Sequence, residues 1–420
     1  MTGVEARGRE AATGVSEGPP LTVVVGLHDG GISGVNTYAE HVAAAAAAGG
    51  AAVTLLATHA SLARMLEARL AGTGVRVVNL GLAPPTPWQR RRERLSPGYA
   101  ARRLSAAVHS GLPRLGRFDA AHANHPALAH AMRPLAGRVI VAAWFHPHAP
   151  VGRAIATWRH TGRHFPRSAG LAVKGVLHYR NDVRGYRAAD AVVAPTLLLT
   201  DELRRAGVPA VHCPPPCRIL EGAEHAADDV AADGNDNGRR RSRLLVCSGD
   251  LDHPRKNVRL AIEAVGLVAR AGRPLALDLV GGNVERLADA LAGLPSSVAV
   301  RRLGPRPPAD VHTLMRAADA LLLPSLFEEW GYVGVEAALQ GTPVVSLPVY
   351  PFDEMLAGGL GRCASGMGAA AFAGAIEEVL ADPPGRRGVA TAAQKRFGLP
   401  AVGRRLMSIW ADAPARPVVV

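Results

Sequence analysis

The sequence is poor in cysteine, in aromatic residues and in lysine, and each shortage excludes a class of protein. Four cysteines in 420 residues are too few for a disulfide framework, which favours a reducing compartment. Aromatic residues make up 4%, so the net charge of +13 lacks the interleaved aromatic residues typical of nucleic-acid binding. Lysine occurs three times among 48 basic residues, as Lys174, Lys256 and Lys395, so a lysine kept inside a motif is informative.

Long apolar runs are also missing. No run reaches the roughly 18 residues that a membrane span requires, and the first twenty residues lack the apolar core of a signal peptide. We therefore expect a soluble, cytoplasmic protein with a disordered arm at residues 1–20. The hydrophobic fraction of 48% favours a large buried core, and the length favours two or three domains.

Short apolar strands alternate with helical segments along most of the chain. The strands expected before residue 205 lie at 21–27, 51–58, 75–81, 119–123, 138–146 and 190–196. Those expected later lie at 243–249, 274–282, 298–304, 319–325 and 342–347. This rhythm predicts an α/β protein with two Rossmann-like, doubly wound parallel sheets, whose ligands bind at the carboxyl ends of the strands.

The domain boundaries follow from breaks in this rhythm. We expect a disordered arm at 1–20, a first domain at 21–205, a linker with a mobile insertion at 206–242, a second domain at 243–395, and a C-terminal helix and tail at 396–420 that packs back on the first domain. Within the linker, Cys213 and Cys217 flank three prolines, which favours a structural loop over a zinc site.

Two glutamates eight positions apart form the strongest motif, in PSLFEEWGYVGVEAALQGTPVV. Glu328 lies in a loop after an expected strand, and Glu336 lies on an apolar helix that begins near Tyr332. An unpaired carboxylate on such a helix is costly to bury, so a diol or another donor is its natural partner.

A second segment, CSGDLDHPRKNVRLAIEAV, is predicted to form a strand, a loop and an amphipathic helix. Lys256 lies in its loop, where a compact positive charge suits a phosphate. Asp250 and Asp252 form a D-x-D sequence that binds a divalent metal in another fold, but the domain organisation does not favour that fold, and we expect no metal.

Together the two segments resemble the donor-binding half of retaining family 4 glycosyltransferases, which have the GT-B fold of two Rossmann-like domains facing across a cleft. The resemblance implies that Glu328 contacts the donor sugar, that Lys256 contacts the donor phosphates, and that Glu336 binds the ribose. It places the diphosphate on the backbone of the helix start. The donor-binding residues expected on this basis are Gly249, Arg255, Lys256, Glu328, Trp330, Gly331, Tyr332, Val333 and Glu336.

Two departures from the family pattern leave questions open. The position of the family arginine, directly after Gly249, is Asp250 in this chain. Either Arg255 or a distant arginine supplies the second positive charge, or phosphate binding is weaker in this chain. Glu329 follows Glu328 where the family has a small residue, which leaves open which glutamate faces the sugar.

The N-terminal half is similar to the acceptor half of the same family. A glycine-rich turn follows the first strand, and two histidine-containing strings lie at expected strand ends. The resemblance places these residues on the acceptor side: Gly30, Gly31, Asn36, His122, His125 and His146. His146 takes the position of the family histidine beside the reacting sugar.

The resemblance implies transfer of a hexose from a nucleotide diphosphate sugar, with UDP the expected carrier, to a hydroxyl of a secondary metabolite, glycolipid or polysaccharide, with retention at the anomeric carbon. His146, Glu328 and Lys256 are the expected catalytic residues, and no cofactor is expected. The arginine-rich segment 86–108 is interpreted as a solvated surface, with peripheral membrane contact or an anionic acceptor as alternatives.

Three other functions remain as alternatives. A nucleotide-sugar 2-epimerase has the same fold and needs no acceptor. A dinucleotide-dependent oxidoreductase is disfavoured because the first turn reads DGGISG and lacks G-x-G-x-x-G. A non-catalytic polyanion-binding protein rests on the net charge alone.

Overall fold

The computed structural model describes residues 20–28, 34–83, 86–89, 105–110, 114–143, 182–220 and 241–414. Most of the arm predicted at 1–20 and most of the insertion predicted within 206–242 lie outside these ranges. So do much of the basic segment 86–108 and three predicted site residues, Gly30, Gly31 and His146.

The first domain is built on a seven-stranded parallel sheet with the strand order β3-β2-β1-β4-β5-β6-β7. Its strands are β1 (Thr22–His28), β2 (Ala52–Ala57), β3 (Arg76–Asn79), β4 (Phe118–Ala123), β5 (Ala136–Ala142), β6 (Ala191–Ala194) and β7 (Ala210–His212). The central strands are buried on both faces, as their continuous apolar sequences predict. Because β7 is the edge strand, this sheet extends past the domain end expected at residue 205.

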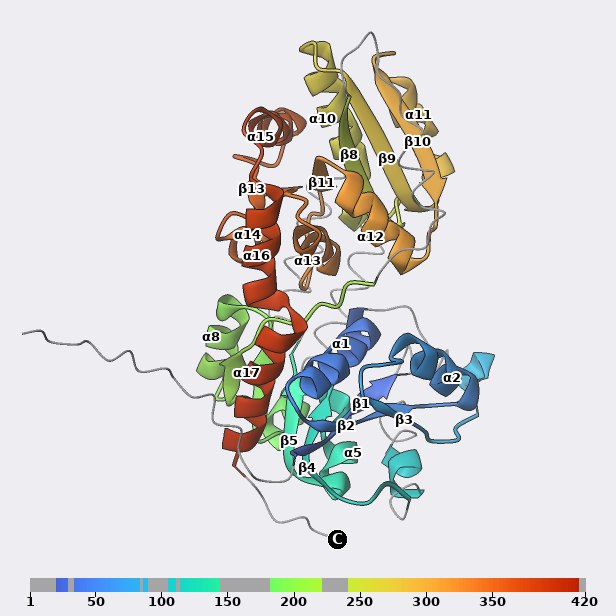
Figure 1. The fold of residues 1–420 in the computed structure, drawn as a ribbon, viewed down its shortest axis with the longest axis vertical. Helices are drawn as coiled ribbons and strands as arrows, with labels where there is room; N and C mark the ends of the chain where they lie inside the picture. The colour runs from blue at the N-terminus through green and yellow to red at the C-terminus, as the bar shows by residue number, and fades with distance from the viewer. Residues whose placement is uncertain are drawn as a thin grey trace, which may run out of the picture.

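The second domain is built on a six-stranded parallel sheet with the order β10-β9-β8-β11-β12-β13. Its strands are β8 (Ser242–Asp250), β9 (Leu275–Gly282), β10 (Val298–Gly304), β11 (Ala320–Leu323), β12 (Val344–Ser346) and β13 (Gly361–Cys363). The two parallel sheets confirm the predicted pair of Rossmann-like domains, which lie one above the other in Figure 1.

Helices connect and cover the strands of both sheets. Those of the first domain are α1 (Gly34–Ala48), α2 (Ala60–Arg69), α5 (Ala129–Met132) and α8 (Leu197–Arg205), with the 3-10 helices η1 (Pro126–Leu128) and η2 (Arg133–Leu135). Those after residue 241 are α10 (Val258–Arg270), α11 (Ala288–Ala292), α12 (Pro308–Ala317), α13 (Tyr332–Leu339), α14 (Phe352–Leu356), α15 (Ala369–Ala381), α16 (Arg386–Phe397) and α17 (Leu399–Asp412), with η3 (Pro254–Lys256) and η4 (Val284–Leu287). Among the described helices, none combines the length and apolarity needed to cross a bilayer.

The C-terminal helix α17 leaves the second domain and packs against α1 of the first (Figure 1). The approach is close, because a Cβ at Gly403 would lie 2.1 Å from the carbonyl oxygen of Ala45. The alanine-rich sequence of α1 therefore has a packing role, since larger side chains would hold the two helices apart. Trp410 of α17 is fully buried and donates from Nε1 to Nδ1 of His122 at 3.2 Å.

A second contact joins the domains at α14. The carboxylate of Glu354 accepts a hydrogen bond from the amide of Leu197, at the start of α8, with 2.9 Å between N and Oε2. Its Oε1 lies 3.1 Å from Nε2 of His212 on β7. The hydroxyls of Thr196 and Tyr350 meet beside this contact. A carboxylate at a helix N-terminus is electrostatically favourable, so Glu354 helps to fix α8 relative to the second domain.

The loop after β7 is part of this junction. Cys213 and Cys217 are buried free thiols, and burial raises the pKa of Cys213 to about 12. The amide of Cys217 donates to the carbonyl of Phe397 at 2.9 Å. The cysteines thus lie in a packed crossing between the domains, the structural role that their sequence favours.

Candidate active site

The loop between β11 and α13 carries the first glutamate of the sequence motif. Helix α13 begins at Tyr332, as predicted, and Gly331 precedes it with φ +85°. Glycine tolerates this left-handed backbone, and a Cβ there would lie 2.9 Å from the ring of Phe352. Among the described residues no side chain caps this helix start. Its first-turn amides can therefore bind an anion.

The loop after β8 lies beside it and carries two cations. Arg255 and Lys256 belong to η3, and Asn257 follows with a left-handed φ of 51° that turns the chain into α10. The amide of Leu326, in the β11–α13 loop, donates to the carbonyl of Arg255 at 2.8 Å. A backbone hydrogen bond thus joins the two loops and fixes the cations beside the start of α13.

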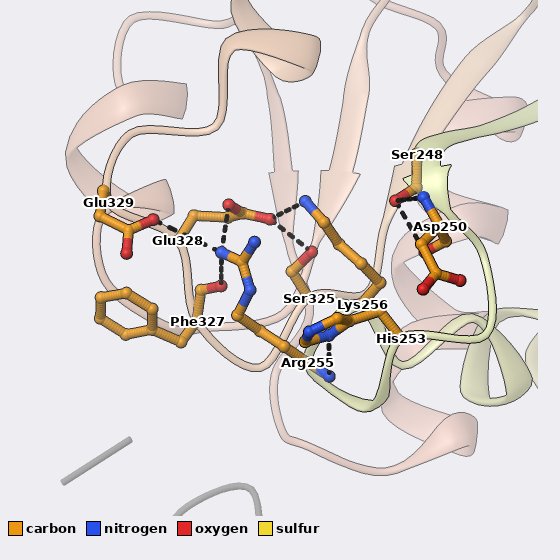
Figure 2. Close-up of polar contacts among 9 residues, drawn as sticks. All are labelled: Ser248, Asp250, His253, Arg255, Lys256, Ser325, Phe327, Glu328 and Glu329. Atoms are coloured by element: carbon orange, nitrogen blue, oxygen red, sulfur yellow. Dashed lines mark hydrogen bonds and ion pairs between the residues drawn. The ribbon is translucent and has the colours of Figure 1, made fainter. Parts of the chain in front are cut away.

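Glu328 lies between these cations (Figure 2). Arg255 Nη1 donates to its Oε2 at 2.8 Å, and Lys256 Nζ donates to its Oε1. Ser325 Oγ also donates to Oε1, at 2.9 Å. Burial alone would raise the pKa of Glu328, but the charges of Lys256 and Arg255 outweigh it and hold the pKa below its usual value. The site therefore holds an ionised carboxylate.

The structure brings three residues of the predicted site into direct contact: Arg255, Lys256 and Glu328. Ser325 was missed by the sequence analysis. A usable signal was present, because it lies three positions before Glu328 in the loop that follows β11.

The two adjacent glutamates differ in their surroundings. The Glu328 side chain is 8% exposed, whereas that of Glu329 is 30% exposed and its Oε2 lies 3.5 Å from Arg255 Nη1. Arg255 also donates to the carbonyl of Phe327 at 3.2 Å, which holds the guanidinium over the loop. Glu328 is therefore the inner carboxylate and Glu329 the outer one.

Asp250 replaces the arginine that the family resemblance would place after Gly249. Its Oδ1 accepts hydrogen bonds from Asn283 Nδ2 at 2.9 Å and from the amide of Asp252 at 3.0 Å. In Figure 2 it lies on the opposite side of Lys256 from Glu328. Asp250 thus closes the turn at the ends of β8 and β9.

The same segment also contains Asp252, the second acidic residue of the D-x-D sequence, and Gly249. The carboxylate of Asp252 pairs with Arg286 at 3.6 Å. Both acidic side chains of the D-x-D sequence therefore have protein partners. Gly249 is exposed, and a Cβ added there would meet no atom within 4 Å.

Glu336 lies on α13 with apolar neighbours, as the sequence predicts. Among the described residues no hydrogen-bond donor or cation pairs with its carboxyl group, and burial raises the pKa of Glu336 to about 7. A ligand with hydroxyl donors, such as a ribose diol, would satisfy this group.

The aromatic residues of the motif pack within the protein. Trp330 is 3% exposed and packs edge-on against Phe397, with 5.5 Å between ring centroids. The ring of Tyr332 packs edge-on against His41 of α1, at 5.4 Å. The start of α13 therefore touches the first domain, and the cation pair lies near the domain interface. The remaining motif residue, Val333, packs against the same apolar core.

In the first domain, His122 is a buried link between helices. Its Nε2 lies 3.0 Å from the hydroxyl of Tyr38 on α1, while Nδ1 accepts from Trp410 on α17. Burial lowers the pKa of His122 to about 3, so the ring is neutral. Both ring nitrogens are used within the protein. His125 is partly buried, and Asn36 is buried in the first turn of α1; the acceptor role of all three remains a prediction.

Family models match both domains. The model described as "Glycosyl transferase 4-like domain" matches residues 33–215, and that described as "Glycosyl transferases group 1" matches residues 234–396. The first match covers most of the first domain, and the second contains Arg255, Lys256, Glu328 and Glu336.

Curated relatives agree with these matches. The chain is 33% identical over 139 residues to D-inositol 3-phosphate glycosyltransferase of Corynebacterium diphtheriae, which covers 31% of this chain and 32% of that protein. The chain thus spans about a third of the length of this relative. It is 27% identical over 316 residues to glycogen synthase of Mycobacterium tuberculosis, covering 72% of this chain and 70% of that enzyme.

Solved structures share the fold. HepE of Anabaena, in complex with UDP and glucose, superposes with a TM-score of 0.58 at 16% sequence identity, covering 93% of this chain and 99% of HepE. The fold is therefore GT-B, as expected from the sequence.

Proposed function

Because the chain belongs to the glycosyltransferases of the GT-B fold, we propose that it transfers a hexose from a nucleotide diphosphate sugar to an acceptor hydroxyl with retention at the anomeric carbon. The observation that carries the proposal is the contact of Arg255 and Lys256 with Glu328, beside the glycine-preceded start of α13. Two cations beside a helix start that no described side chain caps suit a diphosphate, and a buried carboxylate beside them suits sugar hydroxyls.

Each group has a role in this reaction. Lys256, Arg255 and the first-turn amides of α13 stabilise the charge that develops on the leaving diphosphate. Such preorganised electrostatic contacts are often the largest contribution to lowering a barrier, at about 3 kcal/mol for a single donor. Glu328 accepts hydrogen bonds from the donor sugar, and Glu336 accepts them from the ribose. The leaving diphosphate helps to take up the acceptor proton in a front-face displacement.

The chemistry of the substrates is proposed from the relatives. HepE holds UDP and glucose, which supports UDP as the carrier. The named relatives act on an inositol phosphate and on glycogen, which supports a polyhydroxylated acceptor. We propose that the acceptor binds to the first domain, to which the family resemblance assigns Asn36, His122 and His125, together with Gly30, Gly31 and His146 outside the described residues.

The first experiment is a thermal-shift screen of the full chain against UDP, GDP, ADP, TDP and NAD. A nucleoside diphosphate that binds the native state raises the melting temperature by mass action. We expect a shift with one of them that is lost in Lys256→Ala and kept in Lys395→Ala. Lys395 is the matched control because it is exposed on α16, in the same domain. A shift with NAD alone, or equal shifts in both variants, would contradict the donor site.

Activity provides the second test. With the sugar nucleotide that binds, Lys256→Ala should lower turnover at least tenfold, whereas Lys395→Ala should not change it. Conversion of the donor alone into a C2 epimer would identify a 2-epimerase instead.

A further inference from the structure

Glu328 uses both oxygens to hold the two cations that the donor diphosphate would need. Its Oε2 binds Arg255 at 2.8 Å, and its Oε1 binds Lys256 and Ser325. The Glu328 side chain is 8% exposed, whereas those of Arg255 and Lys256 are 31% and 24% exposed. The carboxylate thus approaches the cations from the protein side and leaves their other side open to solvent.

A diphosphate arriving from solvent would meet cations that already have a negative partner. Two like charges a few ångströms apart repel strongly where water is partly excluded. Arg255 and Lys256 together carry two positive charges, and Glu328 cancels one of them. Glu329 also lies 3.5 Å from Arg255, but its side chain is 30% exposed, so water screens its charge more strongly. The presence of Glu328 therefore weakens the attraction that the pair exerts on any anion.

We propose that Glu328 is an internal counter-anion of the Arg255–Lys256 pair. The donor diphosphate displaces Glu328 from the two cations, and Glu328 pairs with them again when the nucleoside diphosphate product leaves. This inference rests on the proposed function and describes how the same site is regulated. Ser325 is neutral, and its hydrogen bond to Oε1 keeps the carboxylate in place when the cations turn to the phosphates.

This exchange makes the site prefer the sugar nucleotide to the product. When the sugar is present, its hydroxyls donate to the carboxylate that the cations have released. When only the nucleoside diphosphate remains, the Glu328 carboxylate, whose side chain is 8% exposed, has lost its ion pairs with Arg255 and Lys256 and has no sugar hydroxyls to replace them. The product is therefore held less tightly than the donor, and its departure restores the ion pairs.

The test measures anion binding by isothermal titration of the full chain and its variants. Inorganic pyrophosphate is the first probe, because it carries the diphosphate charge without base or sugar. We expect Glu328→Gln to bind pyrophosphate at least tenfold more tightly than the parent chain, since the competing charge is gone. Glu329→Gln is the matched control, because it removes the adjacent but more exposed carboxylate, and we expect a change below threefold.

Glu328→Ala serves as a second variant in case the glutamine amide disturbs the loop, and it should shift affinity in the same direction. Unchanged or weaker pyrophosphate binding in folded Glu328→Gln and Glu328→Ala would overturn the inference. A tenfold gain in Glu329→Gln that equals the gain in Glu328→Gln would also overturn it, because the effect would then be a general loss of negative charge.

UDP and UDP-glucose separate this inference from the proposed function. If UDP binds the parent chain and Glu328→Gln does not tighten it, the counter-anion inference fails while the donor site stands. If pyrophosphate binding tightens in Glu328→Gln but no nucleotide binds the parent chain, the proposed function fails and with it the exchange with the donor, and only the competition between Glu328 and anions for the two cations stands. If the proposed function and the counter-anion inference both hold, the parent chain should prefer UDP-glucose to UDP, and this preference should be smaller in Glu328→Gln.

Discussion

Replacing Glu336 by glutamine should make the stability of the protein less dependent on pH. The carboxyl group of Glu336 has no partner among the described residues, and burial raises its pKa from 4.5 to about 7. In the unfolded chain the group ionises near pH 4.5, so between these two values the native state binds more protons than the unfolded state. The contribution of Glu336 to stability is therefore complete below pH 4.5 and is lost as the pH rises through 7.

The magnitude follows from the same two pKa values. Each unit of difference between the folded and unfolded pKa values corresponds to about 1.4 kcal/mol of unfolding free energy, so the stability lost above pH 7 is about 3 kcal/mol. Glu336→Gln carries no charge and does not have this loss. The free energy of unfolding of the variant should therefore gain on that of the parent chain by about 3 kcal/mol between pH 5 and pH 8.

Urea unfolding at pH 5, 6, 7 and 8 measures this difference. Glu378→Gln is the control, since that side chain is 67% exposed and pairs with Arg362 at 3.7 Å, so its removal should leave the pH profile nearly unchanged. Parallel pH profiles for Glu336→Gln and the parent chain would refute the claim that the surroundings of Glu336 raise its pKa.

The same carboxyl group connects stability to donor binding. Ribose hydroxyls that donate to Glu336 favour its ionised form, so nucleotide binding near pH 6.5 should release a proton. Calorimetric titration in buffers with different ionisation enthalpies should detect this release in the parent chain and not in Glu336→Gln. Equal proton release in both would remove Glu336 from the ribose site.

Three further substitutions, one of them with a matched control, test the backbone and the domain contacts. Gly331→Ala should lower the free energy of unfolding by about 2 kcal/mol or more, because φ is +85° and the new Cβ would contact a buried ring. The control Gly249→Ala should be nearly neutral, since a Cβ there meets no atom within 4 Å. Urea unfolding compares the two variants, and equal losses would refute the claim of backbone strain at Gly331. Glu354→Gln should lower the free energy of unfolding by about 1 kcal/mol and speed amide hydrogen exchange at the start of α8. Unchanged exchange at these amides would refute the role of Glu354 as an interdomain contact. Trp410→Phe should cost about 1–2 kcal/mol by removing a buried hydrogen bond to His122, as measured by thermal unfolding; a variant of parental stability would contradict that role.

The fold could be predicted from the sequence because its long strands are continuous apolar runs separated by helices. The exceptions are β7 and β13, which were missed because each has three residues at a sheet edge. So short a segment has no periodicity of its own, and its pairing depends on the neighbouring strand. The predicted end of the first domain at residue 205 was too early for this reason.

The candidate site could be predicted in part. Glu328 and Lys256 stand out by type and spacing, but their contact depends on two loops 72 residues apart that only the folded sheet brings together. The place of Asp250 could not be predicted, because its partner Asn283 follows a different strand. His122 resembles a site histidine in sequence, yet its ring bonds to α17, which reaches it only because the chain returns to the first domain at its end.

An NMR time course of the sugar nucleotide, incubated with the enzyme and no acceptor, shows whether the donor reacts with retention. A retaining transferase hydrolyses its donor slowly, and the first sugar released should keep the anomeric configuration of the donor and its C2 configuration. The rate should fall at least tenfold in Lys256→Ala and stay unchanged in Lys395→Ala. Release of the opposite anomer, formation of a C2 epimer, or equal rates in the two lysine variants would contradict the account.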